Sequence, residues 1–158
     1  MEQTYIQIMI QSLNKKIEVL DRILEVNVTQ KDILENTRST VEAFDKTVDE
    51  KAKLIEQMQQ LDSGFEKIFE RVQEELQKNR EEHAESIRMM QKCIRCITDK
   101  SMEIQVQEAR NKELMIRKFA YVRDTAKNMR TNSKVASHYY KNMMNLHYVD
   151  PQFMDNKK

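Results

Sequence analysis

The stretch that most constrains the fold runs from Val41 to Leu76, where apolar residues recur at alternating spacings of three and four. They form three neighbouring columns with a seven-residue repeat, namely Val41, Val48, Ile55, Asp62, Phe69 and Leu76; Phe44, Lys51, Met58, Phe65 and Val72; and Leu54, Leu61 and Ile68. This spacing places the side chains on one face of a helix and favours a partner helix against it. Because such a face is not stable alone in water, the rest of the chain must cover it.

The composition excludes most folds built from strands. The 158 residues include one glycine, one proline and no tryptophan, and 34% of them are charged. Sandwiches, barrels and βαβ folds need turn residues at regular intervals, whereas long helices need none. We therefore predict an all-α protein, an elongated antiparallel three-helix bundle or coiled coil, with an amphipathic C-terminal helix and a tail.

The predicted helices span residues 3–36, 39–78 and 82–130. In the first helix, apolar residues repeat at four and three, namely Ile6, Ile10, Leu13, Ile17, Leu20 and Leu24. Ser39 followed by Glu42 is typical of a capping box, so we expect a tight turn near residues 37–39. In an antiparallel pair, Ile55 then lies near Leu20; likewise Val41 lies near Leu34, and Phe69 near Ile6.

The sequence offers two positions for the second turn. Ser63 followed by Glu66 could cap a helix, with Gly64 in the turn. The apolar columns nevertheless keep their phase across Gly64. The polar stretch 77–86 also contains no apolar residue larger than Ala84. The phase favours the turn in 77–86, with Gly64 inside a helix at a cost of about 1 kcal/mol relative to alanine.

The third helix has a less regular apolar face. That face begins Ile87, Met90, Ile94 and Ile97, and we expect it to continue as Met102, Val106, Ala109, Ile116 and Ala120. The step from Ile97 to Met102 breaks the heptad, and such breaks turn the apolar face. The unbroken heptad column would instead pass through Ser101, Glu108 and Asn111, which would need polar partners if buried.

Residues 131–158 differ from the bundle predicted for residues 1–130. The last 32 residues, 127–158, carry six basic and two acidic side chains, although the whole chain has a net charge of only +1. Thr131 to Ser133 is typical of a helix break and restart. Beyond it, one helical face gathers apolar residues, namely Val135, Tyr139, Met143 and Leu146, with Tyr140 and Met144 at the flank. This face either binds a partner or packs back on the bundle as a fourth core element.

No residue pattern predicts a catalytic, metal or cofactor site. We interpret His83, His138 and His147 as surface or turn residues, since none has an acidic or cysteine partner at ligand spacing. Cys93 and Cys96 form a lone C-x-x-C within a helix, and we interpret them as small residues flanking the core. No apolar run approaches the roughly 18 to 20 residues that cross a bilayer. The six basic residues are too dispersed for strong nucleic-acid binding.

Three stretches resemble the FlgN family of flagellar export chaperones. LIEQMQQLDSGFEKIFERVQEEL (54–76) is similar to the family's second helix, and IQVQEARNKELM (104–115) is similar to its third. SKVASHYYKNM (133–143), with the ending VDPQFMDNKK, resembles the version found in flagellated Gram-positive bacteria. The longer, glycine-containing first turn of better-studied members is missing here, and their tails differ.

The lack of any nucleophile–base or paired-carboxylate pattern in the sequence argues against an enzyme, and the resemblance implies a small cytosolic helical protein. It implies binding of the hook–filament junction proteins, also called hook-associated proteins, chiefly through the C-terminal segment. It also implies their delivery to the flagellar type III export apparatus. We expect a monomer or weak dimer in the cytoplasm, without membrane insertion. The alternative is a structural coiled coil that oligomerises by pairing its heptads between chains.

Overall fold

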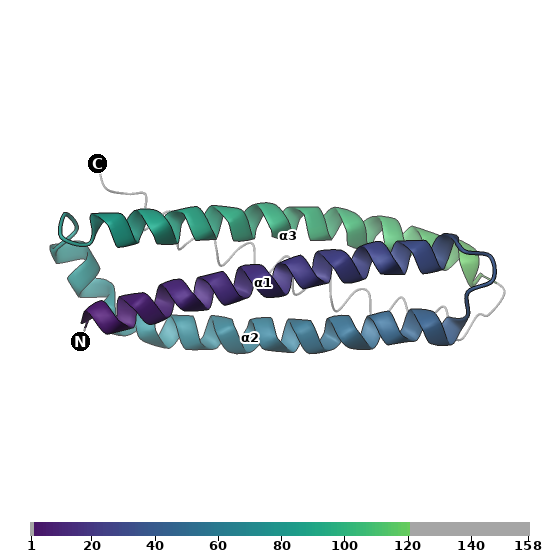
Figure 1. Ribbon diagram of the computed structural model, residues 1–158, viewed down its shortest axis with the longest axis horizontal. Helices are drawn as coiled ribbons and strands as arrows, with labels where there is room; N and C mark the ends of the chain where they lie inside the picture. Colours follow the sequence, from purple (N-terminus) through teal and green to yellow (C-terminus); the bar gives the residue numbers. More distant parts are fainter. Residues whose placement is uncertain (1, 121–158) are drawn as a thin grey trace.

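Three long helices make up residues 2–120, the part of the chain that the computed structural model describes. They are α1 (Glu2–Glu35), α2 (Val41–Lys78) and α3 (Ala84–Lys118). Successive helices run in opposite directions, and α1 packs against both α2 and α3 in an elongated bundle (Figure 1). At 1.5 Å per residue, α2 is about 57 Å long. The predicted all-α bundle of three antiparallel helices is confirmed.

The first turn lies between Glu35 and Val41, but its capping differs from the prediction. Thr40, rather than Ser39, is the N-cap of α2, and its hydroxyl accepts a hydrogen bond from the Ala43 backbone N–H at 3.2 Å. Ser39 instead donates its hydroxyl to backbone carbonyl oxygens of Ile33 and Asn36 at the end of α1. The predicted capping box is therefore wrong, because Ser39 satisfies the end of the preceding helix.

The second turn occupies residues 79–83, between α2 and α3. This position confirms the turn in 77–86 and excludes the alternative at Gly64. Gly64 lies within α2 without a positive φ angle, and nothing lies within 4 Å of where its Cβ would be. The continuous apolar columns therefore outweighed the local helix-breaking signal.

The core consists of two apolar clusters. The main cluster fills the half of the bundle nearer the second turn and includes Ile6, Leu20, Met58 and Ile97. The end cluster lies at the first turn, and its buried members are Leu34, Phe44, Met115 and Phe119. The two residues of each pair predicted between the first and second helices belong to the same apolar cluster. The pairs are Ile55 with Leu20, Phe69 with Ile6, and Val41 with Leu34.

Contacts between α1 and α2 are symmetric about the first turn, as an antiparallel pair requires. Tyr5 accepts a hydrogen bond from Arg71 at 3.0 Å near one end. Lys16 and Asp62 form an ion pair farther along, and Arg22 and Glu50 form another. The column of Phe44, Met58, Phe65 and Val72 is buried together with Lys51, whereas the columns on either side are mostly half-buried.

The apolar face expected on α3 is wrong beyond Ile97. The side chain expected next, Met102, is 50% exposed, and Val106 is 68% exposed. The helix keeps its heptad phase instead, and its buried residues there are Ser101, Ile104, Gln107, Glu108, Asn111 and Met115. Gln107, Glu108 and Asn111 can be buried because α1 and α2 supply hydrogen-bond partners, and Ser101 donates to the Ile97 carbonyl of α3 itself.

The described part of α3 ends earlier than the predicted third helix. The expected range was 82–130, whereas α3 ends at Lys118 and Phe119 caps it, its N–H bonding the Met115 carbonyl at 2.9 Å. Residues 121–130 lie outside the described part of the chain. The division into a bundle (1–130) and a C-terminal segment (131–158) therefore stays a prediction.

Candidate functional site

A layer of buried polar side chains separates the two apolar clusters. The ammonium group of Lys51 on α2 lies 2.7 Å from a carboxylate oxygen of Glu108 on α3. Both side chains are at most 7% exposed. Lys51 also donates to the amide oxygen of Gln30 on α1 at 3.2 Å, so this one ammonium group connects all three helices. A buried charge is tolerated only where it is paired in this way.

Buried amides extend the layer between α1 and α3. Asn111 donates to the Gln30 amide oxygen at 3.0 Å and to the backbone carbonyl of Asn27 at 2.9 Å. Asn27 in turn donates to the Gln107 amide oxygen at 2.9 Å, and Gln30 donates to the Thr47 hydroxyl at 2.9 Å. We call these seven residues the polar layer: Asn27, Gln30, Thr47, Lys51, Gln107, Glu108 and Asn111. Each of these side chains hydrogen-bonds within the layer, although the Asn27 amide oxygen has no partner among the described residues, and the layer fixes the register of the helices.

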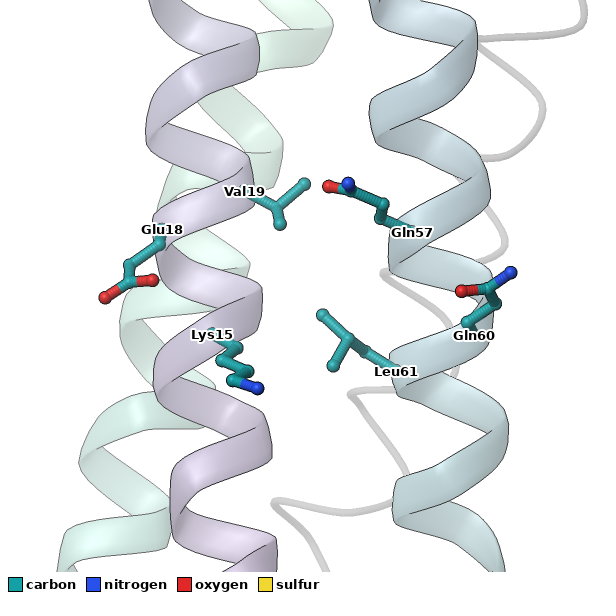
Figure 2. A pocket seen from close by; sticks show the side chains of 6 residues that line it. All are labelled: Lys15, Glu18, Val19, Gln57, Gln60 and Leu61. Carbon is teal, nitrogen blue, oxygen red and sulfur yellow. The ribbon is translucent and has the colours of Figure 1, made fainter.

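A shallow groove lies between α1 and α2, on the surface of the main cluster (Figure 2). Its volume is about 380 Å³, and it is lined by Lys15, Glu18, Val19, Gln57, Gln60 and Leu61. Val19 and Leu61 point into the gap from the two helices, and the amide of Gln57 also points across it toward Val19, whereas Glu18 and Gln60 point away (Figure 2). The groove is open to solvent and has no convergent set of titratable groups, so its chemistry indicates no particular ligand.

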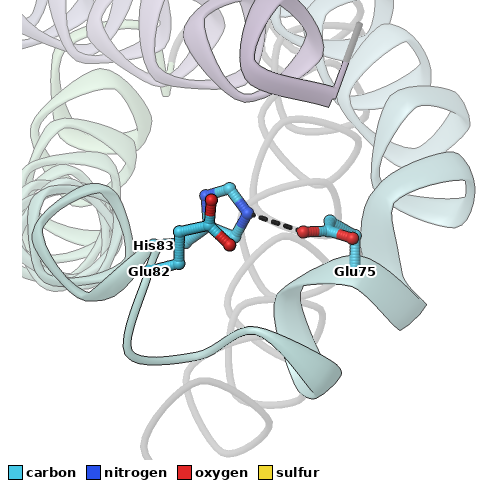
Figure 3. A group of neighbouring side chains, drawn as sticks. All are labelled: Glu75, Glu82 and His83. Atoms are coloured by element: carbon cyan, nitrogen blue, oxygen red, sulfur yellow. Dashed lines mark hydrogen bonds and ion pairs between the residues drawn. The ribbon is translucent and has the colours of Figure 1, made fainter.

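His83 has an acidic partner, contrary to the interpretation from the sequence. It is buried in the second turn, and its Nε2 lies 2.9 Å from a carboxylate oxygen of Glu75 (Figure 3). Asn79 donates to the same carboxylate at 2.7 Å. Hydrogen bonds from Asn79 and then His83 lower the pKa of Glu75. Placement in a turn was predicted correctly, but the partner was missed because the turn brings together residues eight positions apart.

The group formed by Glu75, Glu82 and His83 could in principle reach a metal ion. One ligand atom from each residue lies within 4.8 Å of the others. Glu82 is exposed, however, and the Glu75 carboxylate already accepts hydrogen bonds from Asn79 and His83. These bonds connect the end of α2 to the start of α3, which is sufficient to explain the group as a support for the turn.

The two cysteines lie near the α1–α3 contact. Both are free and half-buried, and the Cys93 Sγ lies 3.6 Å from the amide oxygen of Asn14. Burial, with a smaller contribution from Cys96, raises the pKa of the Cys93 thiol. A raised thiol pKa lowers the thiolate fraction and hence the reactivity. This agrees with the interpretation of the cysteines as residues flanking the core.

The residues predicted to bind a partner are Val135, Tyr139, Tyr140, Met143, Met144 and Leu146, and they all lie outside residues 2–120. Sequence reasoning missed the polar layer and the exposed apolar surface at Met102 and Val106 on α3. The heptad positions of Ser101, Glu108 and Asn111 had indicated that these side chains would need polar partners if buried, but their partners on α1 and α2 were not identified. None of the described helices has an apolar stretch long enough to span a bilayer.

Residues 2–120 define an all-α protein, an elongated bundle of three antiparallel helices. Its polar groups in residues 2–120 act on one another rather than on a substrate pocket. Comparison with known proteins identifies the protein family. The model of the FlgN protein family matches residues 1–145. The chain therefore belongs to the FlgN family of flagellar export chaperones, as its sequence indicated. No curated protein and no solved structure matches the chain.

Proposed function

We propose that this protein is a cytoplasmic chaperone for hook-associated junction proteins. It keeps these export substrates, its clients, soluble and brings them to the flagellar type III export apparatus. The observation that carries the proposal is the FlgN family match. It covers residues 1–145 and so extends over most of the predicted C-terminal client-binding face.

The chemistry of that face supports binding to an unassembled subunit. Val135, Tyr139, Met143 and Leu146 repeat at helical spacing, with Tyr140 and Met144 beside them. Tyrosine offers a large amphipathic contact, and methionine adapts to irregular apolar partners. An amphipathic helix of this kind can cover an apolar helical face of a client and still release it.

The packing of the bundle supports a monomer or weak dimer over an oligomerising coiled coil. The heptad residues Leu20, Met58 and Ile97 are completely buried within one chain. They are therefore not available to pair with a second chain. A coiled coil that pairs its heptads between chains would need the same residues at its interface.

Co-purification with recombinant junction proteins tests the proposal. We expect the tagged chain to form a stable complex with at least one hook-associated protein and to hold it in the soluble fraction. As a matched control, a variant with Val28→Ala and Met89→Ala removes apolar side chains that are half-exposed on the bundle. The control should bind as well as the parent. If the chain binds none of the junction proteins and light scattering shows a stable oligomer, the coiled-coil alternative is correct.

A further inference from the structure

Within residues 2–120, no helix covers the contact between α2 and α3 on the side of the bundle opposite α1. α1 packs along both other helices, whereas the backbones of α2 and α3 hardly approach each other. In Figure 1, α1 lies between the other two helices along most of the bundle. A regular three-helix bundle would have three comparable contacts, so among residues 2–120 the α2–α3 contact is the weakest of the three.

Both helices present apolar side chains toward this side of the bundle. α3 contacts α1 through Cys93, Lys100 and Gln107, which share one side of the helix. Met102 follows Lys100 by two residues and so points about 200° away from that side. It is 50% exposed. Ile116 is two heptads after Met102 and so lies on the same side of α3. It is half-buried and packs against the end cluster.

The matching flank of α2 is also only partly covered. Glu50 and Arg71 contact α1 from one flank of α2, and Lys51 and Phe44 reach α3 through the core. The opposite flank has Val48 and Ile55, each half-buried. We define the α2–α3 seam by these two residues together with Met102 and Ile116.

We propose that the α2–α3 seam is a docking surface for residues 133–148 of the same chain, which lie in it as a fourth helix antiparallel to α3. The connection permits this placement. α3 ends at Lys118, at one end of the seam, and residues 119–132 can span at most about 46 Å. A helix over 133–148 is about 24 Å long, and Met102 lies about 25 Å along α3 from Phe119.

The charges of the two surfaces favour this occupant. Residues 133–148 contain Lys134 and Lys141 and no acidic residue. The start of α2, beside Val48, contains Glu42, Asp45 and Asp49. Burial, together with Asp49 and Glu42, raises the pKa of Asp45, as expected where negative charges are crowded. A basic helix relieves that crowding, and its tether supplies an effective concentration in the millimolar range.

Docking in the seam would regulate the accessibility of the C-terminal segment. The apolar face of Val135, Tyr139 and Met143 cannot cover the seam and a partner at the same time. The apparent affinity for any partner of that face is then reduced by the undocked fraction. If about nine-tenths of the molecules are docked, release of the segment would raise that affinity about tenfold.

Amide hydrogen exchange on the full chain tests the docking without any client. We expect residues 133–148 to be protected in the parent and to exchange at least tenfold faster in Met102→Asp. Met89→Asp is the matched control, because Met89 is a 48% exposed methionine on the other flank of α3. It should leave the protection unchanged. The amides of α1 serve in each variant as a reference for an intact bundle.

Three results would each overturn the proposal: unprotected exchange of 133–148 in the parent, full protection in Met102→Asp, or equal loss in both variants. If the aspartate variant also exposes α1, the pair Met102→Gln and Met89→Gln repeats the comparison without a charge. Since no client is present, failure here is distinguishable from failure of the proposed chaperone function.

Discussion

The ion pair in the polar layer gives the most demanding test of how the bundle is built. Replacing Glu108 by methionine keeps most of the side-chain volume but removes the carboxylate 2.7 Å from the Lys51 ammonium group. Lys51 is then left with the Gln30 amide oxygen at 3.2 Å as its remaining partner in the layer. Removing one partner of a buried ion pair costs about 3–5 kcal/mol.

That cost should appear directly in the unfolding curve. For a chain of this length, about 1 kcal/mol lowers the Tm by roughly 2–4 °C, so Glu108→Met should lower it by roughly 6–20 °C. Circular dichroism at the helical band follows the transition, and urea titration gives the free energy of unfolding. Glu113→Met is the matched control. Glu113 is exposed on the same helix, so the free energy should change by no more than about 0.5 kcal/mol.

A double variant shows whether the loss of stability comes from leaving the Lys51 charge unpaired or from placing an apolar side chain at position 108. Lys51→Met with Glu108→Met removes both charges, and Gln30 keeps its hydrogen bonds to Thr47 and Asn111. Apolar replacement of a whole buried ion pair is often neutral or stabilising, so the double variant should recover most of the stability lost in Glu108→Met. A single variant as stable as the Glu113 control, or a double variant less stable than the single, would refute this reasoning.

Four further predictions concern the fold, each measured by thermal unfolding of the full chain. Leu20→Asp places an unpaired charge in the main cluster and should unfold the bundle, whereas the half-exposed control Val28→Asp should melt near the parent. Gly64→Ala should stabilise the protein by up to about 1 kcal/mol, and a clear loss would contradict its place inside α2. Thr40→Ala should cost about 1 kcal/mol through loss of the α2 N-cap, and an unchanged midpoint would contradict that role. Because hydrogen bonds lower the pKa of Glu75 from 4.5, its charged form stabilises the fold above that pH and is lost as the pH falls through the lowered value. The difference in Tm between the parent and Glu75→Gln should therefore be largest near neutral pH and vanish in acid. A difference that grows in acid would contradict a lowered pKa of Glu75.

The helices and both turns could be predicted because their signals are local. The columns through Phe44, Met58 and Phe65 specify one buried face of α2, and the antiparallel register then follows from the turn. The choice between Gly64 and residues 77–86 was decided by the phase of the apolar columns together with the polar composition of 77–86. These features depend on residues three, four or seven positions apart, which the sequence displays directly.

The features that the sequence did not reveal depend on distant partners. Glu108 looks unsuitable for a core until Lys51, 57 positions away, is placed opposite it. Asn111 likewise depends on Gln30, 81 positions away. Met102 was expected in the core because its hydrophobicity was given more weight than the heptad phase, which points to Ser101. The structure buries the polar residues and leaves Met102 on the surface, where it becomes part of the α2–α3 seam.

The central claim is that the C-terminal apolar face holds a client. Titration of a purified hook-associated protein with the variant Tyr139→Ala and Met143→Ala tests it most directly, alongside the parent and the control with Val28→Ala and Met89→Ala. Buried aromatic anchors contribute most of an interface's energy, so we expect the affinity to fall at least a hundredfold, equivalent to about 2.7 kcal/mol or more. The control should bind like the parent. If the variant binds the junction protein as tightly as the parent does, the claim is contradicted.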